Sequence, residues 1–394
     1  MSIVNVSFLK LKSYCEAEQF KGWDPYDGLN SKIFNALPFK KWDVVRLFWI
    51  QGFKRSPINF RKLLLVPKQH NSKGIALFLA GYCNLYEISK KGNDAFGSKA
   101  EIETWIRTLA DLLLERKNTE YSGACWGYNF DWQARLSFLF PKETPTIVAT
   151  SFCVEALIKA FEITKDEKYL QTAISSAEFV INDLSRSRLK KGFLFSYSPL
   201  NGNNTVINAS LLGAKILSQV FFYTKDRRLK DLAKKTIETC CEIQREDGSW
   251  IYGLMPVQNW IDSFHTGYNL DAIQSYREAT GDSGFDENLQ NGLAYYLRTF
   301  FMQDGTPKYY HNKTYPIDIH CPGQLFVTLS KTKTFSENSM LANKVMDWTI
   351  QNMQDSKGFF YYQIKKRISS KISYMRWSNA FMFNAMTNYI KEMN

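Results

Sequence analysis

The sequence lacks the apolar segments that would direct a chain into or across a membrane. It contains no run of about 18 apolar residues, so we expect no transmembrane helix. Residues 1–20, MSIVNVSFLKLKSYCEAEQF, hold no uninterrupted apolar core with a small-residue cleavage site, so no signal peptide is expected. The seven cysteines are an odd number without the spacing of a disulfide framework. These features predict reduced thiols and a cytoplasmic location.

Motifs of nucleic-acid binding are also missing. No zinc-finger, RNP-type or helix-turn-helix signature accompanies the 50 Lys and Arg residues, which exceed the 38 Asp and Glu and give a net charge of +12. The basic residues are scattered along the chain, and no DxDD or DDxxD cluster of the isoprenoid enzymes occurs. We expect no nucleic acid and no cofactor. An acidic polysaccharide or a membrane surface suits the basic excess better.

Apolar and aromatic residues, in contrast, are plentiful. Apolar residues make up 45% of the chain and aromatic residues 15%, with 29 Phe, 21 Tyr and 10 Trp. This content suffices for a large core, and the aromatic excess suits a sugar-binding cleft because flat rings stack on the apolar faces of pyranoses. Aromatic residues that fill a wide toroid are the alternative interpretation.

A repeat of two helices runs through the chain. The apolar stretch 151–164 ends in Thr164-Lys165-Asp166, and similar stretches end in Thr224-Lys225-Asp226 and Thr280-Gly281-Asp282. A more charged amphipathic stretch follows each of them, as an outer helix follows a buried inner helix. Weaker copies end at Ser89 and Thr332.

A glycine turn followed by aromatic residues closes each unit. Gly192, Gly248, Gly305 and Gly358 begin these turns, and the segment Gln244–Trp250 resembles the Gln/Trp turn of α/α toroids such as terpene cyclases. The inner-helix candidates span 74–88, 147–163, 207–223, 266–279, 320–331 and 376–391. We therefore predict an all-α (α/α)6 toroid over residues 61–394, with residues 1–60 as an N-terminal cap.

The polar segments that follow the glycine turns predict the position of the site. Because up and down helices alternate, these segments meet at the end of the toroid where the inner helices begin, and unpaired N–H groups there favour an anion. Three of the four histidines fall in these segments. The candidate residues of this rim are Trp126, Tyr128, Asp131, Trp132, Arg135, Asn208, Trp260, Asp262, His265, Tyr268, Asn269, His311, Asp318, His320, Gln324, Arg376 and Trp377.

Proton abstraction next to a uronate carboxylate is the chemistry that these residue types suit best. It needs a base and an acid, for which we predict His265 and Tyr268, and groups that hold the anion, for which we predict His320, Asn208 and Arg376. The remaining polar and aromatic residues of the rim would bind the sugar. The acidic substrate would be an oligosaccharide or a polysaccharide.

Other interpretations of the same residues remain open. Asp131 with Asp262 or Asp318 could form the carboxyl pair of a glycoside hydrolase. The neighbours His320 and Cys321, with Cys125, invite comparison with the zinc site of lanthionine-forming cyclases, but the surrounding sequence differs, and we predict no metal. The aspartates and histidines could also serve as helix caps, and the rim as a glycan-binding surface without catalysis.

The chain resembles α/α-toroid proteins found with bacterial capsule and O-antigen biosynthesis genes. The stretches SPINFRKLL at 56–64, DIHCPGQ at 318–324 and YMRWSNAFMF at 374–383 carry this resemblance, together with residues 71–86. More distantly, the layout is similar to heparinase-type lyases and glucuronyl C5-epimerases. The resemblance implies an enzyme of surface-polysaccharide metabolism that associates peripherally with a membrane-bound polysaccharide-assembly complex.

Overall fold

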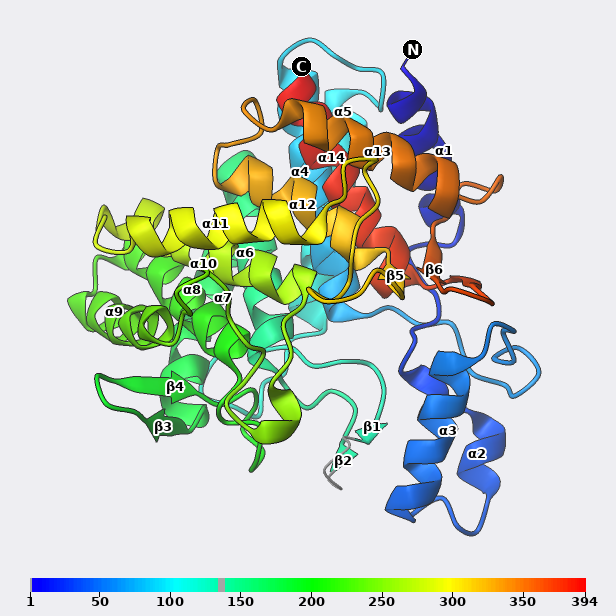
Figure 1. Ribbon diagram of the computed structural model, residues 1–394, viewed down its shortest axis with the longest axis horizontal. Coiled ribbons are helices and arrows are strands. Elements are labelled where there is room, and N and C mark those ends of the chain that lie inside the picture. Colours follow the sequence, from blue (N-terminus) through cyan, green and yellow to red (C-terminus); the bar gives the residue numbers. More distant parts are fainter. Residues whose placement is uncertain (1, 134–138) are drawn as a thin grey trace.

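Six helices pack side by side into a closed ring. The computed structural model describes residues 2–133 and 139–394. Each inner helix contacts the next one in the sequence, and the last contacts the first, which confirms the predicted (α/α)6 toroid (Figure 1). These inner helices are α4 (Ser72–Lys90), α6 (Ile147–Thr164), α8 (Ile207–Thr224), α10 (Ser263–Thr280), α12 (His320–Lys331) and α14 (Phe381–Met393).

An outer layer of more amphipathic helices surrounds this ring. Five outer helices follow their inner partners directly in the sequence, and each packs its apolar face against the ring. The π-helical turn η2 (Phe179–Asp183) extends one of them. The outer helices are α5 (Lys99–Glu115), α7 (Glu167–Glu178), α9 (Arg227–Glu242), α11 (Asp286–Phe300) and α13 (Ser339–Met353), and the sixth is α1 (Ile3–Ala17).

The glycine turn of each unit rests on the outer helix of the next unit. Gly248 and Gly305 have φ of 90° and 89°, and a Cβ on either would clash with the backbone of α11 or α13. Gly358, with φ of 99°, has the same relation to Lys10 of α1. Helix α1 is therefore the outer partner of α14, although we expected it to belong to a cap.

A glutamine strengthens two of these contacts in the same way. Gln244 Nε2 donates to the carbonyls of Gly248 and of Asn288 in α11, each at 3.0 Å. Gln354 Nε2 donates to the carbonyls of Gly358 and of Ser7 in α1, again each at 3.0 Å. The first helix of the chain, α1, thus supplies the outer helix of the last repeat unit.

The Thr-Lys-Asp motif forms the short turn at the other end of a helix pair. Lys165 has φ of 57° and ends α6, and the side chain of Asp166 then caps α7. Lys225, with φ of 56°, and Asp226 do the same between α8 and α9. A left-handed residue followed by an Asx cap reverses the chain within two residues, which explains why the motif recurs.

Short strands, which the all-α prediction did not include, lie in the segments that lead to the inner helices. One antiparallel hairpin pairs Trp132 with Phe140, a second pairs Arg186 with Phe195, and a three-stranded sheet pairs Ile317 with Ile364 and Tyr361 with Ser373. The strands are β1 (Trp132–Gln133), β2 (Leu139–Phe140), β3 (Arg186–Arg188), β4 (Phe193–Phe195), β5 (Ile317–Asp318), β6 (Tyr361–Ile364) and β7 (Ser370–Ser373).

Helices α2 (Lys32–Ala36) and α3 (Asp43–Arg55) project from the toroid. They lie at the lower edge in Figure 1, near β1 and β2, whereas both chain termini lie at the upper edge. A small core of Leu29, Phe34 and Ile50 holds these helices together. The turn η1 (Asp27–Asn30) connects them to the toroid, and a second 3-10 turn, η3 (Pro256–Gln258), lies before α10.

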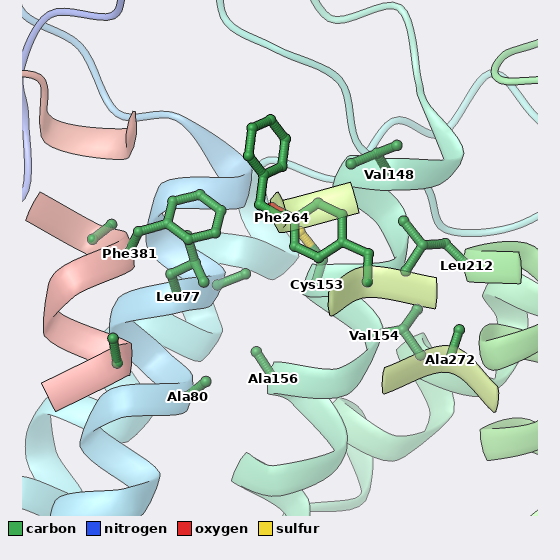
Figure 2. Packing of buried hydrophobic residues seen from close by; sticks show 14 of the residues in the cluster. Leu77, Ala80, Val148, Cys153, Val154, Ala156, Leu212, Phe264, Ala272 and Phe381 are labelled. Carbon is green, nitrogen blue, oxygen red and sulfur yellow. The ribbon is translucent and has the colours of Figure 1, made fainter. Parts of the chain in front are cut away.

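The main core lies between the inner helices and between the two layers of helices. Figure 2 shows Leu77, Ala80, Ala156 and Phe381 gathered between the inner helices. Small side chains let these helices approach closely, and the aromatic rings fill the wider gaps. In the described part of the chain, no helix combines the length and the apolar character needed to cross a membrane.

We expect Gly248→Ala to lower the free energy of unfolding by roughly 1–3 kcal/mol, because alanine is strained at this φ and its Cβ would clash with α11. Urea titration followed by circular dichroism measures the change. Gly52→Ala in α3 is the matched control. No atom lies within 4 Å of its Cβ position, so this substitution should be neutral or stabilising. Equal effects of the two substitutions would contradict this account of the turn.

Candidate functional site

The inner helices begin at one end of the ring, which we call the mouth. Lys73 is in the first turn of α4, His265 is in the first turn of α10, and His320 is the first residue of α12. Trp377 lies in the π-helical turn η4 (Met375–Ala380) that leads into α14. The toroid therefore brings together residues that are far apart in the sequence, as we predicted for the histidines.

His265 and Asp262 form a hydrogen-bonded pair at the mouth. His265 Nδ1 lies 2.7 Å from Asp262 Oδ2, and the carboxylate also accepts from the backbone N–H of His265 and from Trp260 Nε1, both at 3.0 Å. Because a carboxylate only accepts, this contact places the imidazole proton on Nδ1 and leaves Nε2 as the basic nitrogen. Asp262 thus both caps α10 and orients His265.

An aromatic wall surrounds this pair. Tyr252 and Trp260 stack with ring centroids 4.5 Å apart and an interplanar angle of 11°, and the Tyr252 ring lies 4.7 Å from that of His265. The side chain of His265 is 22% exposed, so a ligand can reach it from solvent. Stacked aromatic rings next to a solvent-accessible base are suited to holding a sugar ring during proton transfer.

His320 is enclosed by aromatic rings. Its centroid lies 4.9 Å from that of Phe264 and 4.3 Å from that of Trp377, and the residue is 1% exposed. Burial lowers the pKa of His320 well below its ordinary value, with further lowering by the charges of Lys73 and Arg376, so the ring is neutral. Neither ring nitrogen has a hydrogen-bond partner among the described residues. Buried polar groups in folded proteins are nearly always hydrogen-bonded, so His320 is an exception that needs an explanation.

Asp318 is buried next to His320. It accepts hydrogen bonds from the His320 backbone N–H at 3.0 Å, from Gln363 Nε2 at 2.6 Å and from Trp377 Nε1 at 2.9 Å. Burial raises the pKa of Asp318 to about 6, although these hydrogen bonds oppose the shift. The carboxyl group thereby fixes the position of the Trp377 indole at the mouth.

Lys73 was missed by the sequence analysis. Its Nζ lies 3.3 Å from the hydroxyl of Tyr268 and 4.1 Å from the ring centroid of Phe152. Burial lowers the pKa of Lys73 well below its ordinary value, and the charge of Arg376 lowers it further. The available signal was a lysine in the first turn of an inner helix whose next ten residues, 74–83, are almost all apolar. Burial also raises the pKa of Tyr268, so its hydroxyl stays protonated.

Arg376 lies at the mouth but is already paired. Its Nε and a terminal nitrogen bind both oxygens of Asp24, at 2.6 Å and 2.8 Å, and its guanidinium lies 5.0 Å from the ring centroid of Tyr128. Both charged groups are buried. This pairing neutralises the guanidinium that we expected to hold a substrate anion. The sequence contained no signal that linked Asp24 to the site.

A second buried pair ties the N-terminal segment to the mouth. Arg61 Nε lies 2.6 Å from Asp27 Oδ1, and a terminal nitrogen of Arg61 donates to the Tyr374 hydroxyl at 3.0 Å. Tyr26, in the same segment, has its ring centroid 5.6 Å from that of Trp377. Tyr26, Asp27 and Arg61 therefore lie beside the mouth residues Tyr374 and Trp377.

Several predicted site residues make hydrogen bonds that stabilise the fold. Trp126 is fully buried and donates to the carbonyl of Leu113, and Asp131 accepts from the backbone N–H of Lys142. His311 Nδ1 lies 3.3 Å from the carbonyl of Ile261. Each of these contacts holds a connecting segment in place.

The other predicted residues have varied surroundings. Trp132 packs against Tyr26 and Phe140, whereas Asn208 and Asn269 each bury an amide oxygen that has no partner in residues 2–133 and 139–394. Gln324 donates to Asp271 and Thr328 in the interior of the ring. Arg135 lies outside the described residues. Metal ligands do not cluster in the described part of the chain in groups of three or more.

A cavity of about 210 Å³ lies inside the ring and extends from Tyr268 towards the opposite end. Phe152, Tyr268 and Phe381 line its inner end, and Lys73 lies one helical turn nearer the mouth than the lining residue Leu77. Charged residues line the remainder, including Lys215 and Glu155, which form an ion pair at 2.7 Å. The histidines of the mouth do not line this cavity, so we place the site at the mouth.

Known proteins share this fold. No protein-family model matches the sequence, and no curated protein matches it. Cellobiose 2-epimerase from Bacillus thermoamylovorans B4167 has a TM-score of 0.60 at 13% identity, over 82% of this chain and 89% of that chain. An unsaturated glucuronyl hydrolase specific for heparin has a TM-score of 0.58 at 12% identity, over 82% and 86%. A protein from Listeria innocua has a TM-score of 0.64 at 12% identity, over 100% and 98%.

These comparisons establish the α/α-toroid fold of carbohydrate-active enzymes. Identities of 11–14% to eight of these structures show the fold alone. Neighbours with this fold include sugar epimerases and glycoside hydrolases. The chemistry of this chain must therefore be argued from its own mouth residues.

We expect Asp318→Asn to change the pH dependence of stability. Because the native pKa of about 6 exceeds the ordinary value of about 4, the stability that Asp318 contributes is complete below pH 4 and is lost as the pH rises through 6. Relative to Asp318→Asn, the wild type should lose on the order of 2 kcal/mol between pH 4 and pH 7. Urea unfolding across this range provides the measurement.

Asp347→Asn, an exposed site on α13, is the control for this comparison. Burial also raises the pKa values of Asp27 and Asp271 to about 6. Both groups are present in the wild type and in Asp318→Asn, so their contributions to the pH dependence cancel in the difference. Parallel stability curves for the wild type and Asp318→Asn would show that Asp318 titrates normally.

Proposed function

We propose that the mouth is the active site of an enzyme that removes a proton next to the carboxylate of a uronate-containing glycan. The observation that carries this proposal is the His265–Asp262 pair, which presents Nε2 at a partly exposed, aromatic-lined position. The toroid fold that the chain shares with a sugar epimerase supports it. The excess of positive charge, +12, suits an acidic substrate.

His265 is the general base of the proposed reaction. Its Nε2 would take the proton from the sugar carbon, and the imidazolium that forms would be stabilised by the Asp262 carboxylate 2.7 Å from Nδ1. An oriented imidazole of this kind contributes roughly 10²–10⁴-fold to a proton transfer. Trp260, which bonds to the same carboxylate, keeps the pair in this geometry.

Lys73 and Tyr268 would stabilise the negative charge that develops on the substrate. An anion beside Lys73 would favour the ammonium form, because an opposite charge at close range raises the pKa of an amine. The Tyr268 hydroxyl stays protonated and can donate a hydrogen bond or a proton. Lys73 thus takes the anion-holding role that we had assigned to Arg376, which is paired with Asp24.

His320 and the two buried asparagines complete the substrate contacts. Sugar hydroxyl groups would donate to the unpartnered amide oxygens of Asn208 and Asn269. The unpartnered N–H of the neutral His320 ring would donate to a hydroxyl or ring oxygen of the sugar. Return of a proton to the opposite face of the carbon would give an epimer. Loss of the substituent on the next carbon, with protonation by Tyr268, would give an unsaturated product.

The resemblance to capsule and O-antigen proteins suggests the biological substrate. We assign the enzyme to bacterial surface-polysaccharide metabolism in the cytoplasm, acting on an acidic oligosaccharide or polysaccharide, with peripheral association with a polysaccharide-assembly complex. The aromatic residues Tyr128, Trp132 and Trp377 would extend the sugar-binding surface from the base towards the N-terminal segment.

Glycoside hydrolysis is the second candidate, because a hydrolase has the same fold. It would need two carboxyl groups on opposite sides of a glycosidic bond. Asp262 and Asp318 are buried and each accepts three hydrogen bonds, and Asp131 accepts from Lys142 at 2.7 Å in a connecting segment. These environments favour proton abstraction by His265 over hydrolysis.

Incubation with uronate-containing bacterial polysaccharides in deuterated water tests the reaction. We expect deuterium in the product or an unsaturated product by mass spectrometry, and a loss of about 10²–10⁴-fold in rate for His265→Ala because the base is removed. His70→Ala, whose ring contacts the carbonyl of Gln19, is the matched control and should retain full activity. Full activity of His265→Ala would exclude this base, and shortened chains without deuterium would support the hydrolase.

We expect Lys73→Met to raise the stability of the protein and to lower its activity. The buried Nζ has no salt bridge in the described part of the chain, so an apolar side chain should raise the free energy of unfolding by on the order of 1 kcal/mol. The same substitution should reduce kcat/KM by at least about tenfold, because the developing charge loses its partner. Unchanged kcat/KM with an unchanged unfolding curve would remove Lys73 from the site.

A further inference from the structure

Helices α2 and α3 and their loops expose an unusual concentration of apolar side chains. We call residues 32–65 the projecting cap. Phe48 and Leu63 are each 73% exposed, Trp42 67% and Val44 64%. Soluble surfaces rarely gather large apolar side chains in this way unless something covers them. The other exposed apolar residues of this cap are Ile33, Phe39, Ile58, Phe60 and Leu65.

Helix α3 has two apolar faces, and only one of them is buried. Ile50 and Phe53 face the protein, where Ile50 packs with Leu29 and Phe34 in the small core. Val44 and Phe48, four residues apart, form the outward stripe. Trp42 extends this stripe and packs against Phe39, with ring centroids 6.3 Å apart. The outward face is not needed for the packing of the cap.

The projecting cap is also strongly basic. It contains eight Lys and Arg residues and a single acidic residue, Asp43, which is paired with Arg46. Arg61 is buried with Asp27, but most of the other basic side chains are exposed. The exposed basic residues are Lys32, Lys40, Lys41, Arg55 and Lys62. A large part of the net charge of +12 is therefore concentrated beside the apolar stripe.

We propose that the projecting cap docks onto the surface of an anionic lipid bilayer. Apolar and aromatic side chains would enter the boundary between headgroups and acyl chains, while the lysines would lie among the anionic headgroups. A second copy of this chain would bring two strongly basic surfaces together, which like-charge repulsion opposes. Nucleic acid would match the charge but would leave Val44, Phe48 and Leu63 without an apolar partner.

Docking would place the mouth next to the bilayer. Lys54 of α3 donates to the hydroxyl of Tyr26 at 2.6 Å, and Tyr26 in turn packs against Trp377. Figure 1 shows α2 and α3 at the same edge as the hairpins that lead to the inner helices. A glycan attached to a lipid would then be within reach, a consequence that rests on the proposed function. The docking itself does not depend on it.

Co-sedimentation of the full chain with lipid vesicles tests the proposal. We expect binding to vesicles of equimolar phosphatidylglycerol and phosphatidylcholine, and little binding to pure phosphatidylcholine. Raising the salt from about 0.1 M to about 1 M shortens the Debye length from about 10 Å to about 3 Å and should weaken the binding. Absence of binding to the anionic vesicles at low salt would overturn the proposal.

Two double variants, each with a matched control, locate the binding surface. Lys40→Ser with Lys41→Ser should weaken binding roughly thirtyfold, at about 1 kcal/mol for each lysine. Trp42→Ser with Phe48→Ser should weaken it at least tenfold. The controls, Lys90→Ser with Lys91→Ser and Phe222→Ser, change exposed residues at the opposite ends of α4 and α8 and should bind normally.

The controls and the oligomeric state show whether the projecting cap binds a lipid bilayer or a second copy of the chain. If the control variants bind as weakly as the cap variants, the attraction is nonspecific and the proposal fails. If the wild type does not bind vesicles but forms a dimer that Trp42→Ser with Phe48→Ser abolishes, the surface is an interface between copies and the proposal also fails. Circular dichroism of each variant verifies that the helical fold is retained.

Discussion

The contact between each glycine turn and the next outer helix is the constraint on which the rest of the structure depends. At Gly248, Gly305 and Gly358 the chain passes so close to the neighbouring helix that no side chain fits. This contact sets the distance between successive helix pairs and thus the curvature of the ring. Since α1 supplies the last of these surfaces, the two ends of the chain must meet before the ring can close. Every inner helix then begins at the same mouth.

The mouth concentrates polar groups at the end of a densely apolar ring. The first turn of an inner helix lies next to the mouth, and Lys73, His265 and His320 occupy such positions. The helix caps contribute as well, because the Asp262 carboxylate that satisfies the start of α10 also orients His265. Structural and chemical roles are therefore combined in the same residues.

Buried charge pairs join the N-terminal segment to this mouth. Arg376 with Asp24 and Arg61 with Asp27 are both removed from water, so breaking either pair would leave an uncompensated charge. These pairs hold Tyr26 against Trp377 and thereby fix the side of the mouth from which the projecting cap extends. Through Tyr26, which contacts both Lys54 and Trp377, this segment connects the proposed active site with the proposed membrane surface. Lys73 differs because it forms no ion pair with a carboxylate among the described residues, although the charge of Asp24 partly opposes the lowering of its pKa.

The sequence by itself determined the six inner helices, the turns between them and the end of the ring at which His265, Asp262 and His320 meet. Those features depend on local chemistry: apolar periodicity, left-handed turn residues and Asx caps recur within each unit of the repeat. Only the tertiary structure decided that α1 pairs with α14, that Asp24 neutralises Arg376 and that Lys73 faces Tyr268. These contacts join residues 352 and 195 positions apart in the last two cases. A periodic pattern does not encode such partners, because they are selected by the closure of the ring and by the cost of burying an unpaired charge.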